Sequence, residues 1–215
     1  MNMVELMLGI SLLTIVMSGL THAVPILQKS IYEGRTLREE IAQVEQVLQI
    51  ITRSVQQAGF ENIIKNQSQI TRSQKSPMQG IEIFQQAVLS TDKVGKISAP
   101  QSYLAGRRQT DAMLIQHDTY GHFDCVGRKI TDKRTHQGLS RIGFFIQFRG
   151  NKSNAIGTLM CQSLTNKGQI QNDGILTGVD DFLIYLEDGV VIIELTMQSS
   201  RQYQTSIALQ NQISL

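Results

Sequence analysis

The first 59 residues constrain this chain most, because they form one long helical pattern that is apolar in its first half and amphipathic in its second. Between Met3 and Val24 the one charged side chain is Glu5, and no Lys or Arg precedes Lys29. About 20 apolar residues at ~1.5 Å each can span the ~30 Å hydrocarbon layer of a membrane. The lack of basic residues distinguishes the segment from an ordinary secretory signal peptide. The sequence therefore predicts a helix that anchors the chain in a membrane.

Glu5 requires an explanation, since a carboxylate within a bilayer costs roughly 2.5–3.5 kcal/mol. Met1 lies four residues earlier, on the same helical face. Its α-amino group, or that of a neighbouring copy, could neutralise Glu5. Alternatively, Glu5 snorkels to the headgroups beside a single-pass anchor. These residues alone leave both explanations open.

The second half of the helical pattern is predicted to pack on a sheet. Pro25 follows the apolar run and is expected to kink the helix or loosen its hydrogen bonding. Beyond it, one stripe of apolar residues recurs at helical spacing: Leu37, Ile41, Val44, Leu48, Ile51 and Val55. Three heptads are marginal for a coiled coil, and strand-rich sequence follows, so a helix packed on a sheet is favoured. Gly59 is expected to end the helix as a left-handed cap.

Short apolar runs after the polar stretch 62–80 predict strands, because turn signals separate them. The runs are 81–84, 111–116, 142–148, 157–164, 179–185 and 190–197. Glu187-Asp188-Gly189 is typical of a hairpin turn, and 206–209 is a candidate edge strand. The sequence predicts an α+β fold in which the helix covers one face of an antiparallel sheet of four or more strands.

Composition fits one anchor and one globular domain of about 150 residues. The net charge of +2 is too small to indicate a nucleic acid or another anionic partner. Cys125 and Cys161 are the only cysteines. In the oxidising compartment expected beyond a membrane segment, they are predicted to form a disulfide.

Two groups of polar residues are possible metal sites. The first comprises His117, Asp118, His122, Asp124 and Cys125. The spacing of these residues matches no zinc-binding pattern, and Cys161 is a better partner for Cys125 than a metal ion is. The other group comprises Asn172, Asp173, Asp180 and Asp181. Its spacing differs from an EF-hand loop, and such residues are common in turns, so we predict no metal and no cofactor.

No motif in the sequence indicates catalysis. The chain contains no G-x-S-x-G, no glycine-rich phosphate loop and no H-E-x-x-H. The histidines lie among turn-like residues without a credible nucleophile. A non-enzymatic protein is therefore predicted.

Several segments resemble one family. Residues 3–10, with the sequence MVELMLGI, resemble the mature amino terminus of type IV pilins and pseudopilins, in which a hydrophobic helix carries an acid at its fifth residue. Ala58-Gly59-Phe60 at the end of the helix, Asp124-Cys125-Val126-Gly127 and Leu159-Met160-Cys161 resemble elements of the PilW-type minor pilins. Residues 178–182, GVDDF, resemble a strand entry of the same group.

The resemblance implies a type IV pilin-like fold. Residues 1–25 would be the transmembrane and filament-core half of the helix, 26–59 the amphipathic half that packs on the sheet, and 60–215 a β-rich periplasmic domain. Met1 would be the processed and N-methylated terminus. Glu5 would steer assembly by pairing with the Met1 ammonium of a neighbouring subunit, and the two cysteines would form a domain disulfide.

The function implied is that of a minor pilin that initiates or caps a type IV pilus and so supports adhesion, twitching motility or DNA uptake. Its partners would be other minor pilins, the major pilin, the inner membrane and the pilus assembly platform. It would cross the inner membrane once, with a periplasmic domain, and reach the pilus tip after assembly. Two alternatives remain: a pseudopilin of a type II secretion system, and a membrane-anchored extracytoplasmic ligand-binding domain or enzyme.

Overall fold

In a computed structural model of the 215-residue chain, the described residues are 3–58, 80–90, 97–98, 110–118, 123–135, 139–149 and 155–209. The chain divides into two compact units, Met1–Glu45 and Gln46–Leu215. We call the second unit the body. Gly59, the predicted cap, and most of the polar connection that follows it lie outside the described residues.

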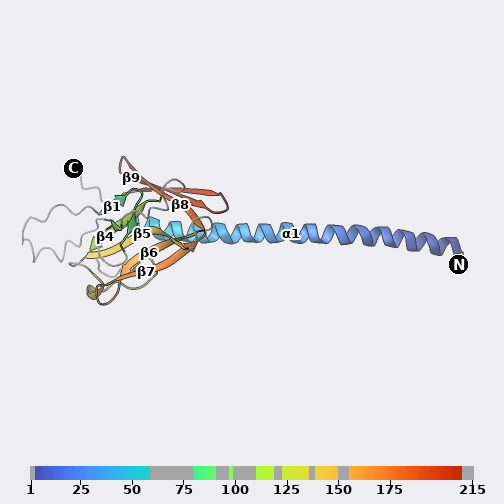
Figure 1. The fold of residues 1–215 in the computed structure, drawn as a ribbon, viewed down its shortest axis with the longest axis horizontal. Coiled ribbons are helices and arrows are strands. Elements are labelled where there is room, and N and C mark those ends of the chain that lie inside the picture. The colour runs from blue at the N-terminus through green and yellow to red at the C-terminus, as the bar shows by residue number, and fades with distance from the viewer. Residues whose placement is uncertain are drawn as a thin grey trace, which may run out of the picture. The chain divides into compact units, whose positions relative to one another are not determined.

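Residues 3–45 of helix α1 (Met3–Gln56) make up the described part of the first unit, and the helix runs on through Pro25 without interruption (Figure 1). The large apolar side chains that the structure describes between Met3 and Val24 are 46–77% exposed. Farther along, ion pairs join Lys29 to Glu33 at 3.9 Å and Arg35 to Glu39 at 3.5 Å, each one turn apart. Within the described part of the chain, no helix combines the length and apolar content needed to cross a membrane.

The last turns of α1 belong to the body and carry a buried apolar stripe. Val47, Ile51 and Val55 are buried, whereas Leu48 is half-buried. Ser54 is also buried, and its hydroxyl donates to the Ile50 carbonyl at 2.9 Å, which satisfies the polar group within the helix. The predicted apolar stripe is therefore buried at this end of the helix, but the buried face is centred on Val47 and Ile51 and not on Leu48.

The larger sheet of the body has five antiparallel strands in the order β1-β4-β5-β6-β7. Its strands are β1 (Ile81–Phe84), β4 (Ala112–Asp118), β5 (Leu139–Arg149), β6 (Ile156–Leu164) and β7 (Ile170–Thr177). Ile142, Phe144 and Ile146 alternate along β5, and all three are buried, as their period of two predicts.

The opposite face of this sheet is also apolar. Strand β2 (Val88–Leu89), which pairs with β3 (Ile97–Ser98), contributes Leu89 to a buried cluster with Ala112, Phe145 and Met160. A Cβ at Gly143 would collide with Leu89 Cδ1. Glycine at that position therefore leaves room for the Leu89 side chain against the sheet.

A second sheet has three antiparallel strands in the order β10-β9-β8. They are β8 (Val179–Glu187), β9 (Val190–Met197) and β10 (Gln202–Ala208). The predicted hairpin turn joins β8 to β9, and both of its central residues, Asp188 and Gly189, have positive φ (45° and 76°). Two positive φ values are what a tight two-residue hairpin requires.

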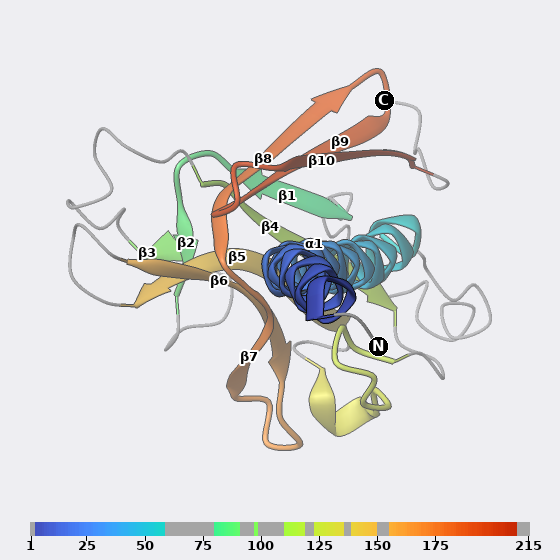
Figure 2. The same ribbon diagram turned by 90° about the vertical axis from the view of Figure 1, so that its right-hand side faces the viewer.

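The predicted pilin-like fold is wrong, because the strands do not form one sheet under a helix. They divide between separate antiparallel sheets, which Figure 2 shows with β8, β9 and β10 splayed away from β5, β6 and β7. The division occurs at Gly178, whose φ of 83° turns the chain between β7 and β8. Gly178 donates to the Gly157 carbonyl at 2.9 Å, and β8 then pairs with β9. The structure supports an α+β fold without a pilin-like arrangement.

Candidate functional site

A disulfide joins Cys125 to Cys161, which confirms the predicted pairing. Cys161 lies in β6, and Cys125 lies in a turn between β4 and β5. Their Cα atoms are 6.1 Å apart, the sequence separation is 36 residues, and both side chains are buried. A chain-entropy estimate for a loop of this length gives roughly 3.5–4 kcal/mol of stabilisation.

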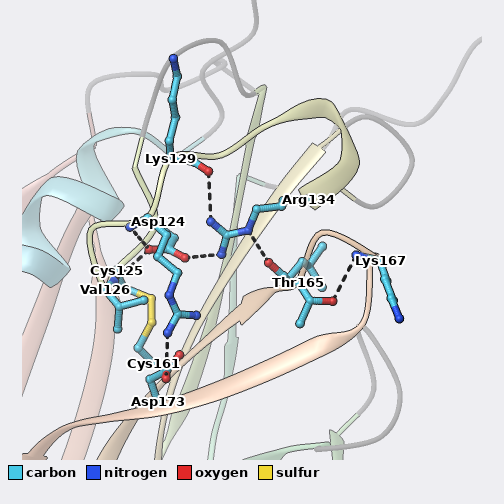
Figure 3. A network of polar contacts seen from close by, with 11 residues as sticks. Asp124, Cys125, Val126, Lys129, Arg134, Cys161, Thr165, Lys167 and Asp173 are labelled. Atoms are coloured by element: carbon cyan, nitrogen blue, oxygen red, sulfur yellow. Dashed lines mark hydrogen bonds and ion pairs between the residues drawn. A yellow bond between two sulfur atoms is a disulfide. The ribbon is translucent and has the colours of Figure 1, made fainter.

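Asp124, the residue before Cys125, stabilises the turn between β4 and β5. Asp124 Oδ1 accepts hydrogen bonds from the backbone N–H groups of Val126 at 3.1 Å and Arg128 at 2.7 Å. Its Oδ2 accepts from Arg134 Nη2 at 2.6 Å (Figure 3). Such side-chain to backbone bonds are typical of Asp in tight turns. Both carboxylate oxygens are therefore engaged in holding the turn.

Arg134 ties this turn to the end of a strand. It lies in a short 3-10 helix, η1 (Asp132–Arg134). Its Nε donates to the Leu164 carbonyl at 2.7 Å, and its Nη1 donates to the Lys129 carbonyl at 3.0 Å. The side chains of Arg134 and Asp124 are only 7% and 2% exposed. A buried guanidinium is tolerated here because each of its nitrogens has a partner.

A third link lies closer to the surface. Arg128 Nη2 lies 3.1 Å from Asp173 Oδ1 on β7, and these side chains are 41% and 28% exposed. We call residues 124–135, with this ion pair and the disulfide, the braced loop. The contacts that it makes to β6 and β7 hold a structural element in place.

One pair that the sequence did not indicate has the spacing of a nucleophile and its base. Ser140 Oγ lies 3.1 Å from His117 Nδ1 and 3.0 Å from His117 Nε2, because the two residues face each other in the β4–β5 register. Both side chains are at most 2% exposed. A substrate could not reach this hydroxyl, so the pair is a buried polar contact within the sheet.

A second polar group spans β1, β4 and β5. Gln116 Nε2 donates to Glu82 Oε1 at 3.1 Å across the β1–β4 pair. Burial lowers the pKa of Arg141 on β5, and the Glu82 carboxylate opposes that shift. These residues give the five-stranded sheet a polar margin beside its apolar centre.

The candidate metal ligands that the structure describes do not form a cluster. His122 and the side chain of Asp118 lie outside the described residues. Asn172 and Asp173 lie on β7, whereas Asp180 and Asp181 lie on β8 in the other sheet. Among the described residues, no three or more His, Cys, Asp or Glu side chains are close enough to hold a metal ion.

The structure describes the predicted assembly residues only in part. Met1 lies outside the described residues, as does the side chain of Glu5, although the Glu5 backbone is helical. Pro25 is exposed within α1. Comparison with known proteins found no matching family model, no similar curated protein and no similar solved structure.

Proposed function

We propose that this chain is a non-enzymatic assembly subunit, a minor pilin that joins other minor pilins to initiate or cap a type IV pilus. The observation that carries the proposal is the exposed apolar surface of α1. Met3, Met7, Leu12, Leu13 and Met17 are each at least 58% exposed. Burying such side chains against neighbouring helices stabilises an assembly by roughly 25 cal/mol per Å² of apolar surface.

Glu5 supplies specificity in this proposal. In a bundle of apolar helices, an acid without a cation would be buried uncompensated. Pairing with the Met1 ammonium of the next subunit avoids this cost and fixes the axial stagger between subunits. Before assembly, the inner membrane would hold the helix and leave the body in the periplasm, where the Cys125–Cys161 disulfide is stable.

The body supports a structural role. Its buried Asp124–Arg134 pair and its disulfide brace a loop, and its Ser140–His117 contact is closed to solvent. A pseudopilin of a type II secretion system would have the same parts, so the second candidate differs only in the machine that takes up the subunit. The subunits that co-purify with the chain distinguish the two.

Replacing Glu5 by Leu tests the proposal in cells that produce the whole assembly system. The variant is expected to keep the disulfide and the unfolding behaviour of the body, yet to lose partner capture and surface piliation, or secretion in the second candidate. The loss reflects removal of one member of a buried pair, which costs roughly 3–5 kcal/mol.

Glu33→Leu is the matched control, because Glu33 is an exposed acid on the same helix that pairs with Lys29. It should assemble normally. If Glu5→Leu also supported normal piliation, secretion and partner capture, Glu5 would be a passive acid and the proposed function would be wrong.

A further inference from the structure

Strand β10 is an edge of the three-stranded sheet. It pairs with β9 over seven consecutive positions, from Gln202–Thr196 to Ala208–Val190, with no shift in register. On its other side, no described strand pairs with it. The backbone groups on that side therefore form a regular row.

The hydrogen bonds to β9 identify which groups form this row. Leu209 N–H donates to the Gly189 carbonyl, and the Arg201 carbonyl accepts from Met197 N–H, both at 2.9 Å. In an antiparallel pair the bonded residues alternate, so the odd-numbered residues of β10 bond to β9. The even-numbered residues direct their N–H and C=O groups away from the sheet: Gln202, Gln204, Ser206 and Ala208. All four have exposed side chains.

The other edges of the two larger sheets carry features that obstruct pairing. Strand β1 has only four residues, and β7 carries the charged Asp173 and an extra residue, Ile175, where its register with β6 shifts. Beside β8, Asp111 donates its N–H to the Phe182 carbonyl at 2.7 Å and accepts from Ile184 N–H at 2.9 Å. Short length, charge, bulges and covering segments are the usual means of protecting an edge.

Within the described part of the chain, strand β10 has none of these features. Its sequence, QYQTSIA, contains no charge and no proline, and it is seven residues long. Natural edge strands left in this state act as templates for another strand. The contrast with β1, β7 and β8 indicates that β10 is an interaction surface.

We propose that β10 pairs antiparallel with β10 of a second copy of this chain, about a two-fold axis at Thr205. The result is a continuous six-stranded sheet with the order β8-β9-β10-β10-β9-β8. The interface is isologous, because the same residues contribute from both copies. This inference does not depend on the proposed function.

The register of the β10–β10 pair follows from which backbone N–H and C=O groups point outward. Hydrogen-bonded pairs must join even-numbered residues, and the axis at Thr205 is the one that pairs all seven positions of both strands. Gln202 then faces Ala208, and Gln204 faces Ser206, with about eight backbone hydrogen bonds between the copies. Any other register that joins even-numbered residues leaves positions unpaired.

The side chains suit this register. Thr205 faces its own counterpart, and Tyr203 faces Ile207. Threonine pairs and aromatic pairs with β-branched residues are among the favourable cross-strand neighbours. No charged residue lies in the strand, so no like charges meet. Self-complementarity of this kind is the reason for assigning a second copy as the occupant.

Cysteine cross-linking of the full chain in a mild detergent tests both the surface and the register. The described residues contain no free cysteine, and both cysteines of the chain are in the disulfide, so an introduced thiol is the only reactive one. Thr205 and its counterpart form a non-hydrogen-bonded pair, with Cα atoms about 4.5 Å apart, which suits a disulfide. Thr205→Cys is therefore expected to give a covalent dimer on mild oxidation.

Two controls fix the register. Gln204→Cys alone should stay monomeric, because its counterpart lies diagonally, about 8 Å away. Ser206→Pro, added to Thr205→Cys, should abolish the cross-link, since it removes an outward N–H that β9 does not use. An unchanged Cys125–Cys161 disulfide and urea midpoint would show that the body stays folded.

The proposal is overturned if Thr205→Cys stays monomeric. It is also overturned if Gln204→Cys cross-links equally well, since that result would indicate collision or association through α1. Persistence of the cross-link in the Ser206→Pro background of a folded protein would exclude backbone pairing at this edge.

Discussion

Replacing Arg134 by Met should destabilise the body strongly. The guanidinium is 2.6 Å from Asp124 Oδ2, and the two side chains are almost fully buried. Methionine has a similar reach and is apolar, so the substitution retains much of the packing. What it removes is the cation, which leaves a buried carboxylate without a counter-charge.

The magnitude follows from what remains at the site. Breaking a buried ion pair from one side costs roughly 3–5 kcal/mol. The carbonyls of Leu164 and Lys129 also lose their donors, whereas Asp124 keeps its backbone bonds from Val126 and Arg128. Those two bonds continue to stabilise the anion, so we expect about 3 kcal/mol. With an m value of about 2 kcal/mol per M, the urea midpoint should fall by roughly 1.5 M.

Urea titration under non-reducing conditions measures this difference. The chain has no tryptophan and five tyrosines, so tyrosine fluorescence reports the transition. Arg128→Met is the matched control, because it breaks the Arg128–Asp173 pair, whose side chains are 41% and 28% exposed. An exposed pair contributes about 0–1 kcal/mol. Equal midpoints for the two variants would refute the argument that burial makes the Asp124–Arg134 pair the dominant one.

Two further substitutions probe the packing of the body. Ile51→Ala should lower the free energy of unfolding by roughly 2–5 kcal/mol, and Leu48→Ala by less, because Ile51 is fully buried and Leu48 is half-buried; equal urea midpoints would contradict this order. Gly157→Ala should cost about 3 kcal/mol, because its Cβ would collide with the backbone carbonyl oxygen of Val179, which cannot rotate away as a side chain can. Thermal unfolding measures that cost, and an unchanged melting temperature would show that the contact between Gly157 and Val179 tolerates a methyl group.

Hydrophobic periodicity located most of the strands. The six predicted runs all lie within or overlap described strands, and the turn at Asp188-Gly189 lies where the sequence placed it. These features are local: alternating side chains and two positive φ values are recorded in neighbouring residues. The same holds for the buried stripe of α1, where Val47, Ile51 and Val55 recur at helical spacing.

Strand β7 was missed because its sequence is that of a turn. Residues 171–174 read Gln-Asn-Asp-Gly, which local propensity assigns to loops. The strand forms because partners across the sheet satisfy its polar groups. Gln162 Nε2 donates to Asn172 Oδ1 at 3.0 Å, and Arg128 pairs with Asp173. An edge strand can hold such residues, since its burial is only partial.

The braced loop was predictable in one part and not in another. Two cysteines in a chain leave a single intramolecular pairing, so the disulfide could be inferred from counting. The Asp124–Arg134 pair has no such signal. It depends on the Leu164 carbonyl, 30 residues further along the chain, lying within reach of Arg134 Nε, and only the folded sheet brings these groups together.

The error in fold class has a comparable cause. Alternation shows which face of a strand is apolar, but the same alternation serves equally well in either of two sheets. Phe144 on β5 and Phe182 on β8 are both fully buried at alternating positions, yet their strands belong to different sheets. The choice is made at Gly178, where a positive φ turns the chain, and at Gly157, where the absence of a Cβ lets the start of β6 contact the Val179 carbonyl. In a sequence, a single glycine within a strand pattern looks the same whether it bends one strand or separates two sheets. Strand pairing therefore could not be predicted from the sequence at this point.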